Sequence, residues 1–451
     1  MRQTEARGKR DEDQDLADHI TSLINRWSEG LQRSDFDAVW LAAGEAHNYF
    51  QDDHGPSFKP NPYFTQLVDP TFAHAGAHCF IKPGQKPHLF VLQPTDYWYA
   101  PGQLPDYLSP HVELSVFSTS EELLAACRGI QTANSSCAYI GQEMGNESLG
   151  TPNPANLLAY MDYHRATKSE YELTLMRKAS EIGVKGHLAA ERTFTTGGSE
   201  FDIHMAYLQA SGQTELEIPY GNIVALNEHG ATLHYQFQER SPPSPVRSLL
   251  IDAGGNYAGY ASDITRTYTM DPSSDFAGLI ASMQIHQDKI IAGIRTGESY
   301  AQLHESMHRS LASVLADAGL VNCSADEAFA LGITEKFCPH GLGHLLGIQV
   351  HDVGGHLADD TGQEAPPPSN YPSLRFTRDI EVNQVFTIEP GLYFIESLLA
   401  ELKTSNADIN WPLVDELTVF GGIRIEDNIR VLDDGTENLT RDAWQKVTLA
   451  S

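Results

Sequence analysis

Residues 337–355, FCPHGLGHLLGIQVHDVGG, place three histidines in one glycine-rich stretch of a chain that has 19 histidines in 451 residues. Glycine allows backbone conformations that are closed to other residues, and it lets the backbone come close to a ligand. The mixture of Gly and His therefore predicts imidazoles around a site rather than histidines that only cap loops. The zinc motif His-Glu-x-x-His is excluded, because Gly341 follows His340 and Gly343 precedes His344. A metal site here would need carboxylates from elsewhere in the chain.

The first two candidate carboxylates flank a glycine-containing turn. An apolar strand runs into Asp252, and a second strand begins near Asp263. A hairpin centred between Tyr257 and Ala258 would make these two acids directly opposed cross-strand partners, with Cβ atoms about 5 Å apart. Two ionised carboxylates at that separation repel each other on a half-buried sheet. A bound cation resolves this conflict.

Two further acids occupy similar settings. Glu389 ends the apolar strand 385–388 before a Pro-Gly turn, and Glu426 follows the alternating segment 421–425, which puts Arg424 and Glu426 on one face. Four carboxylates and one imidazole could hold two cations. A donor set rich in hard oxygen favours Mn²⁺, Co²⁺ or Zn²⁺ over a thiolate site, and the chain has no dedicated calcium loop.

These blocks carry a family resemblance. The order Asp, Asp, His, Glu, Glu, together with PHGLGH at 339–344, VHDVGG at 350–355, IEPG at 388–391 and GIRIED at 422–427, resembles the M24 metallopeptidases. Within that family the chain is most similar to the bacterial Xaa-Pro dipeptidase (prolidase) group, which includes the organophosphorus acid anhydrolases. The resemblance extends over about residues 165–440 and is looser in the first domain.

The chain is expected to contain two domains. Alternating short strands and helices predict an α/β domain over residues 1–165. The boundary falls near residue 165, where one expected helix ends and a second begins after Ser169 as its N-cap. The resemblance implies that residues 166–451 form a pita-bread catalytic domain, and that the first domain serves dimerisation and closure of the site.

The resemblance also implies a dinuclear metal site. Two divalent ions, Mn²⁺ first and Co²⁺ or Zn²⁺ as alternatives, would hold a bridging hydroxide that hydrolyses Xaa-Pro dipeptides. The residues that match the family's metal ligands are Asp252, Asp263, His344, Glu389 and Glu426.

Further roles follow from the same resemblance. Glu389 is expected to act as a proton shuttle as well as a ligand. His351 and His234 would steady the substrate and the tetrahedral intermediate, and Arg424 would orient Glu426 or the substrate. Three residues are expected in substrate binding: Arg375 at the substrate carboxylate, His340 as pocket wall, and Asp53, reaching from the other subunit of a homodimer, at the free amine.

The amino-acid composition limits the cellular compartment and the kinds of partner that are expected for this protein. Five scattered cysteines without a Cys-x-x-Cys motif fit reduced thiols, and neither an apolar signal region nor a membrane-spanning run is present, so a cytoplasmic protein is expected. The formal net charge of −30 argues against nucleic acid or an anionic membrane as a partner.

Other functions remain open from the sequence. An aminopeptidase P that takes longer peptides would have the same fold, and organophosphate P–F or P–O hydrolysis could be a side activity of the same site. A non-catalytic pita-bread binding module is disfavoured, because all five metal-ligand positions are intact.

Overall fold

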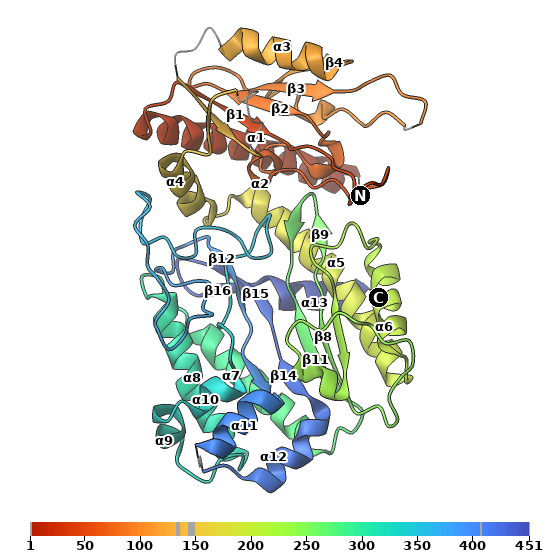
Figure 1. Cartoon of the computed structure of the whole chain (residues 1–451), viewed down its shortest axis with the longest axis vertical. Helices are drawn as coiled ribbons and strands as arrows, with labels where there is room; N and C mark the ends of the chain where they lie inside the picture. Colours follow the sequence, from red (N-terminus) through yellow and green to blue (C-terminus); the bar gives the residue numbers. More distant parts are fainter. Residues whose placement is uncertain (1, 99, 132–135, 143–148, 406–407, 451) are drawn as a thin grey trace. The chain divides into compact units, whose positions relative to one another are not determined.

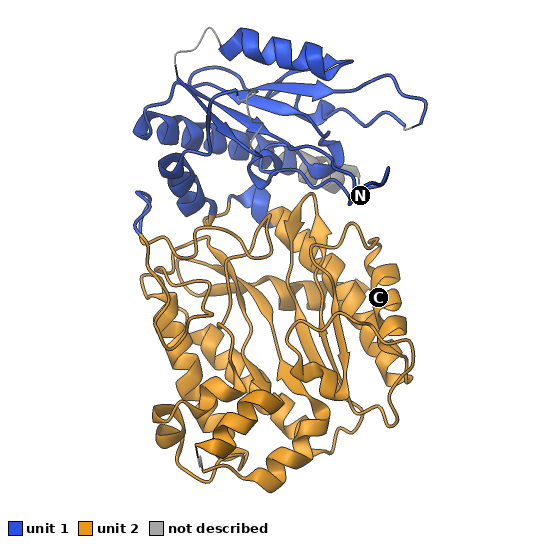
Figure 2. Ribbon diagram, viewed as in Figure 1, with its two compact units in different colours: residues 1–165, 169–173, 359–363 blue, residues 166–168, 174–358, 364–451 orange. Residues whose placement is uncertain are grey.

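The computed structural model describes residues 2–98, 100–131, 136–142, 149–405 and 408–450. The chain forms two compact units, coloured separately in Figure 2. The N-terminal unit comprises residues 1–165, 169–173 and 359–363, and the C-terminal unit comprises residues 166–168, 174–358 and 364–451.

The N-terminal unit is built on a six-stranded mixed sheet with the order β4-β3-β2-β1-β5-β6. The strands are β1 (Ala38–Ala42), β2 (His78–Ile81), β3 (His88–Leu92), β4 (Glu113–Phe117), β5 (Cys137–Ile140) and β6 (Thr151–Pro152). Its helices are α1 (Arg2–Arg33), α2 (Pro62–Thr65), α3 (Ser120–Gln131) and α4 (Ala155–Arg165). The expected α/β character of this part of the chain is confirmed.

Helices cover both faces of this sheet, and alternate strand residues explain how. Val39 and Leu41 of β1 share a buried cluster with Trp27 of α1. Trp40, between them in the sequence, packs on the opposite face with Cys127 of α3. Because side chains alternate across a strand, an apolar run such as 38–42 supplies both cores at once.

The C-terminal unit contains short antiparallel strands that meet in a curved array (Figure 1). These strands are β7 (Ile223–Leu226), β8 (Ser248–Asp252), β9 (Asn256–Tyr257), β10 (Tyr260–Ala261), β11 (Thr265–Thr269), β12 (Val385–Ile388), β13 (Gly391–Tyr393), β14 (Gly422–Arg424), β15 (Asp427–Val431) and β16 (Thr436–Asn438). One strand set has the order β11-β8-β7, and a second has the order β12-β15-β16. An isolated bridge between Thr265 and Glu426 joins the two sets, so residues from both can face one site.

Helices pack against this strand array. The helices are α5 (Glu170–Thr195), α6 (Glu200–Ser211), α7 (Asp275–Gly293), α8 (Tyr300–Asp317), α9 (Ala325–Ala330), α10 (Ile333–Phe337), α11 (Glu396–Thr404), α12 (Trp411–Leu417) and α13 (Leu439–Ala450). Phe194 of α5 and Tyr207 of α6 share a buried cluster with Val224 of β7. Met283 of α7 belongs to a larger cluster that includes Phe386 of β12. The resulting architecture is the expected pita-bread fold.

The structure corrects the predicted register of the β8–β11 region. Asp252 pairs with Thr265, not with Asp263. The turn lies at Ala258 and Gly259, whose φ angles are 50° and 87°, and Tyr257 pairs with Tyr260 across it. Two successive residues with positive φ are typical of a two-residue hairpin turn, which moves the centre one residue along the chain. Asp263 is therefore offset from Asp252 by two residues, which still leaves both acids on one face.

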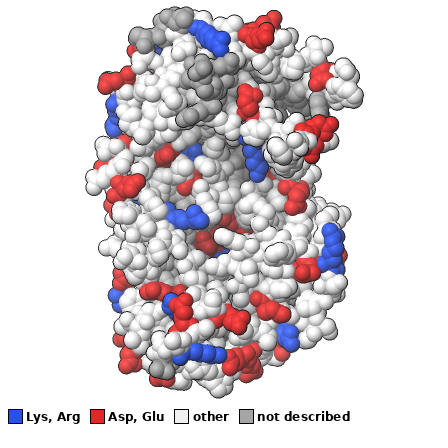
Figure 3. Space-filling view, viewed as in Figure 1, with Lys and Arg blue, Asp and Glu red and all other residues white. Residues whose placement is uncertain are grey.

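Surface charge and helix composition relate to the partners and the setting that the amino-acid composition predicts. Acidic side chains are spread over the face drawn in Figure 3, and the basic side chains there do not gather into one patch. In the described part of the chain, no helix combines the length and the apolar character needed to cross a membrane.

Candidate metal centre

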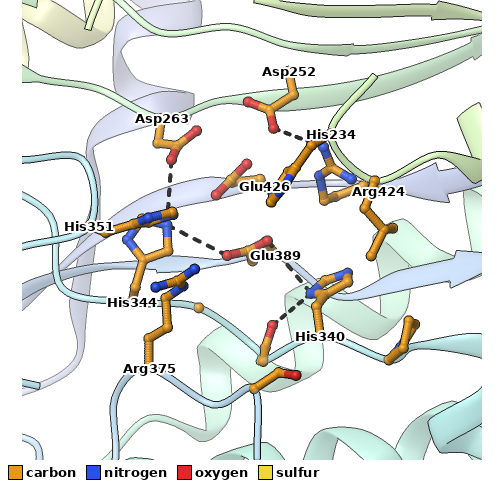
Figure 4. A pocket seen from close by; sticks show the side chains of 15 residues that line it. His234, Asp252, Asp263, His340, His344, His351, Arg375, Glu389, Arg424 and Glu426 are labelled. Carbon is orange, nitrogen blue, oxygen red and sulfur yellow. Dashed lines mark hydrogen bonds and ion pairs between the residues drawn. The ribbon is translucent and has the colours of Figure 1, made fainter. Parts of the chain in front are cut away.

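A pocket of about 270 Å³ opens in the C-terminal unit, and Figure 4 shows the side chains that line it. The lining residues are Leu233, His234, Asp252, Asp263, Pro339, His340, Gly341, Gly343, His344, His351, Ser373, Arg375, Glu389, Arg424 and Glu426. They come from strand ends and from loops, above all the long connection between α10 and β12. The glycine-rich stretch therefore lines the same pocket as the four acids.

Asp252 and Asp263 meet at one tyrosine. Asp252 is the last residue of β8, and Asp263 lies two residues before β11. The Tyr220 hydroxyl is 2.7 Å from Asp252 Oδ1 and 2.5 Å from Asp263 Oδ1. One hydroxyl proton cannot serve two ionised carboxylates at once. The close approach of these three oxygen atoms therefore needs another proton or a cation.

The remaining candidate ligands lie close by. His344 Nε2 is 3.4 Å from Asp263 Oδ2 and 3.6 Å from Glu389 Oε1. One ligand atom from each of Asp263, His344 and Glu426 falls within 4.8 Å of the others, and all three residues are buried. His344 Nδ1 is 3.0 Å from the Leu345 carbonyl oxygen, which can accept a hydrogen bond from the ring and leave Nε2 free for a metal.

Burial and mutual repulsion raise the pKa values of most of the carboxylates in the pocket. Burial and the neighbouring Asp263 raise the pKa of Asp252 to about 6. Burial raises the pKa of Glu389 to about 7. Burial, with Asp263 and other acids nearby, raises the pKa of Glu426 well above its ordinary value. Among these four carboxylates, Asp263 alone has a lowered pKa, because the hydrogen bond and the charge of His344 outweigh the effect of burial.

This donor set fits divalent metal ions. Four carboxylates and one imidazole line one pocket, and ligand atoms of Asp263, His344 and Glu426 lie within 4.8 Å of one another, so burial places like charges where they repel strongly. Protonation or cation binding would relieve that repulsion. The mixture of oxygen donors and one nitrogen donor suits Mn²⁺, Co²⁺ or Zn²⁺.

Arg424 connects the metal-facing acids to the pocket wall. Its Nη2 donates to Asp252 Oδ2 at 2.8 Å, and its Nη1 donates to the Tyr393 hydroxyl at 2.9 Å. The same hydroxyl lies 2.9 Å from His340 Nε2. Burial lowers the pKa of His340 to about 3, so this histidine is a neutral wall residue at pH 7.

The other predicted substrate residues occupy different surroundings. His234, His351 and Arg375 line the pocket with exposed side chains (Figure 4). Asp53 belongs to the N-terminal unit, where it is exposed and lies 2.7 Å from His54 Nδ1. Asp53 is thus absent from the described residues that line the pocket.

Three residues at the site were missed from the sequence. Tyr220 contacts two acids, Thr265 donates to Glu426 Oε2 at 2.6 Å, and Tyr393 connects Arg424 to His340. Thr265 could have been found, because it lies two residues after Asp263 on the same strand face. Tyr220 and Tyr393 come from other elements and carry no local signal.

Fold and pocket together define a metal-dependent hydrolase, and the comparison with family models agrees. The model for metallopeptidase family M24 matches residues 174–433, more than half of the chain, so the chain belongs to that family. The model for the N-terminal domain of Xaa-Pro dipeptidase matches residues 14–163. The resemblance predicted from the sequence blocks is confirmed.

Named relatives refine the placement to the Xaa-Pro dipeptidase group. A Xaa-Pro dipeptidase of Shewanella woodyi is 44% identical over 430 residues, covering 94% of this chain and 97% of the relative. A Xaa-Pro dipeptidase of Xanthomonas euvesicatoria is 42% identical over 432 residues, covering 95% and 97%. The similarity therefore includes the first domain as well as the metal-facing blocks.

A solved structure shares the fold at lower sequence identity. Escherichia coli aminopeptidase P, in a variant described as His350Ala, aligns with a TM-score of 0.74 at 21% identity, covering 97% of this chain and 98% of that one. This likeness supports the two-part architecture.

Proposed function

We propose that the protein is a Xaa-Pro dipeptidase that depends on two divalent metal ions. The observation that carries the proposal is the set of four converging carboxylates beside one imidazole, in a chain more than 40% identical to Xaa-Pro dipeptidases along almost its whole length. Asp252, Asp263, His344, Glu389 and Glu426 would hold the metals. Bound metals would supply an activated water and polarise the scissile carbonyl group.

The side chains of the pocket have the properties that this hydrolysis needs. Partial desolvation in the pocket, together with the neighbouring His344 and Arg375, lowers the pKa of His351 to about 4 although the side chain is solvent-accessible, so its neutral ring can donate a hydrogen bond to the developing negative charge at neutral pH. His234, which lines the same pocket as His351 but comes from a different loop, can also hold the substrate. Glu389, whose Oε1 lies 3.6 Å from His344 Nε2 in the pocket, can take up a proton and deliver it to the leaving proline nitrogen.

Arg375 is proposed to select the dipeptide's carboxylate. It is the exposed guanidinium among the residues that line the pocket, and a planar guanidinium pairs with a carboxylate through two parallel hydrogen bonds. Asp53 of a second subunit is proposed to meet the free amine and to complete the site in a homodimer. Asp53 is exposed, so an amine could replace His54, whose Nδ1 lies 2.7 Å from the Asp53 carboxylate.

The proposal extends to the metal, a side reaction and the cellular compartment. Mn²⁺ is proposed as the working metal, because the donor set is dominated by carboxylate oxygen. Organophosphate hydrolysis is proposed as a side activity of the same activated water. Five free cysteines, four of them buried, support a reducing and hence cytoplasmic setting, and the net charge of −30 opposes nucleic acid as a partner.

The test compares metal-stripped protein with and without added Mn²⁺ on the dipeptide Ala-Pro. Cleavage that requires Mn²⁺, is lost in Asp263→Asn and is retained in the exposed control Asp434→Asn is the expected result. Cleavage without metal, or an Asp263→Asn variant as active as the parent, would overturn the proposal.

Aminopeptidase P activity is the second candidate, favoured by the fold shared with the E. coli enzyme. The tripeptide Ala-Pro-Ala distinguishes the two. A dipeptidase should cleave Ala-Pro and leave the tripeptide intact, whereas an aminopeptidase P should release alanine from the tripeptide.

A further inference from the structure

A buried carboxylate outside the pocket gathers an unusual number of donors. Glu200 is the first residue of α6, and only 1% of its surface is exposed. Its Oε1 accepts hydrogen bonds from the Leu226 backbone N–H at 2.9 Å and from His229 Nδ1 at 2.7 Å. Its Oε2 accepts from the Tyr235 hydroxyl at 2.9 Å and from the Glu239 backbone N–H at 2.8 Å. Every donor lies between 26 and 39 residues away along the chain.

These donors bracket one loop that faces the pocket. We call residues 227–239 the His234 loop, because His234 within it lines the pocket together with Leu233. Leu226 and Glu239 stand at the two ends of the loop, and Tyr235 follows His234 directly. The Glu239 carbonyl also accepts from the Phe201 backbone N–H at 3.1 Å, so the far end of the loop is bound twice to the start of α6.

The loop has a compact interior held against Glu200. The rings of His229 and Tyr235 stack at 4.5 Å with an interplanar angle of 19°, and both rings donate to the same carboxylate. By contrast, no side-chain hydrogen bond within the described residues holds the exposed His234 ring. The position of that ring is therefore set by the backbone of its loop.

The hydrogen bonds to Glu200 are strong enough to fix the position of the His234 loop. Hydrogen bonds to a charged acceptor are roughly twice as strong as those between neutral groups, and four of them converge on the buried Glu200 carboxylate. Removing the charge leaves buried donors without a partner, which the loop can relieve only by moving. A displacement of about 1 Å at a group that contacts substrate is enough to lower a rate by about a hundredfold.

We propose that Glu200 is a positioning residue that fixes His234 for contact with the substrate. The inference rests on the proposed function, in which His234 holds the dipeptide. None of the four hydrogen-bond partners of Glu200 lines the pocket, and Glu200 acts only through the His234 loop.

A double-mutant cycle tests this coupling. Glu200→Gln keeps the shape of the side chain but replaces one acceptor oxygen with a donor. It should lower kcat/KM for Ala-Pro about 10- to 100-fold and change kcat and KM in the same proportion as His234→Ala. In the His234→Ala background the same substitution should have less than about a twofold further effect. Equal losses in both backgrounds would overturn the proposal.

Two variants separate positioning from loss of folding. Asp202→Asn weakens the capping box at the same end of α6, where Ser199 and Asp202 bond reciprocally, and the hydrogen bonds of Asp202 go to Ser199 and not to the loop. It should leave kcat/KM within about twofold. Tyr235→Phe removes one of the four bonds and should give an intermediate loss. If Glu200→Gln does not fold, a Tyr235→Phe variant with parental activity would overturn the proposal.

Hydrogen exchange provides a readout independent of activity. Glu200→Gln should speed amide exchange in residues 226–239, while Asp202→Asn should not. If the parent protein fails to cleave Ala-Pro, the proposed function fails while faster exchange still shows that Glu200 fixes the loop. Unchanged exchange in an active protein overturns the role of Glu200 alone.

Discussion

Glu426 and Asp427 are neighbours in the chain and are both buried, yet their surroundings are opposite. Asp427 accepts from Arg266 Nη2, Asn438 Nδ2 and Arg441 Nε, each at 2.7 Å. Glu426 accepts from one hydroxyl, that of Thr265, and the acids Asp263, Glu389 and Asp252 outweigh the nearby charge of Arg424.

Their pKa values diverge accordingly. Burial raises the pKa of Glu426, and the nearby Asp263 raises it further. Burial acts in the same direction on Asp427, but the charges of Arg266 and Arg441 outweigh it and lower the pKa of that carboxyl. A buried acid neutralised by arginines stabilises the fold, whereas a buried acid surrounded by acids marks a place for a cation.

The largest expected effect separates the two residues by activity. Glu426→Gln should lower kcat/KM for Ala-Pro by about a thousandfold or more, because a proposed metal ligand is lost. Asp427→Asn should keep activity within about tenfold per folded molecule, since neither Asp427 nor its arginine partners are among the described residues that line the pocket. Steady-state kinetics with bound-metal analysis measures both. Equal losses in the two variants would remove the distinction.

Stability should change in the reverse order. Asp427→Asn removes the charge that neutralises the partly buried Arg266 and should lower the free energy of unfolding by about 3 kcal/mol. Glu426→Gln relieves repulsion and should leave the melting temperature of the metal-free protein unchanged or higher. Chemical denaturation in the presence of a chelator checks both variants. A Glu426→Gln variant that unfolds more easily than the metal-free parent would contradict the account of repulsion.

Glu426 and Asp427 also show how much of the site can be predicted from the sequence. The order of acids and histidines was enough to predict the family and a common pocket, because each block is local and distinctive. Nothing local distinguishes Glu426 from Asp427, since their roles depend on Arg266 and Arg441, which come from a distant strand and a terminal helix.

The failures of sequence reasoning have physical reasons too. Asp252 and Asp263 were placed opposite each other because the hairpin was assumed to be symmetric about them. The backbone at Ala258 and Gly259 sets the turn one residue later. Tyr220 was missed because a tyrosine ahead of a strand carries no sign that two carboxylates will share its hydroxyl.

The stability of the metal-free protein should depend on pH in opposite ways at the pocket acid Glu389 and at Asp427. The pKa of Glu389 is raised to about 7 from its ordinary 4.5, chiefly by burial, so the folded state binds more protons than the unfolded chain between these values. Stability should therefore be greatest below about pH 4.5 for this group and fall, by up to roughly 3 kcal/mol, as the pH rises to 7. Asp427, with its lowered pKa, contributes stability that is lost only as the pH falls below its ordinary range.

Thermal unfolding in a chelator between pH 4.5 and 7.5 checks this slope. The Glu389→Gln variant is the matched control, because it cannot titrate at that position. The parent should lose stability relative to this variant as the pH rises. A constant difference across the range would show that Glu389 does not titrate as its burial implies.

The smallest expected effect lies at the hydroxyl shared by Asp252 and Asp263. Tyr220→Phe keeps the ring and removes only the oxygen atom 2.7 Å from one acid and 2.5 Å from the other. Partners of metal ligands typically contribute 10- to 100-fold to metal affinity, so Mn²⁺ binding should weaken by about tenfold. Calorimetric titration measures the change, and Tyr268→Phe, which alters a buried hydroxyl away from the pocket lining, is the control. A Tyr220→Phe variant that binds Mn²⁺ more tightly than the parent would mean that the hydroxyl competes with the metal for these carboxylates instead of orienting them.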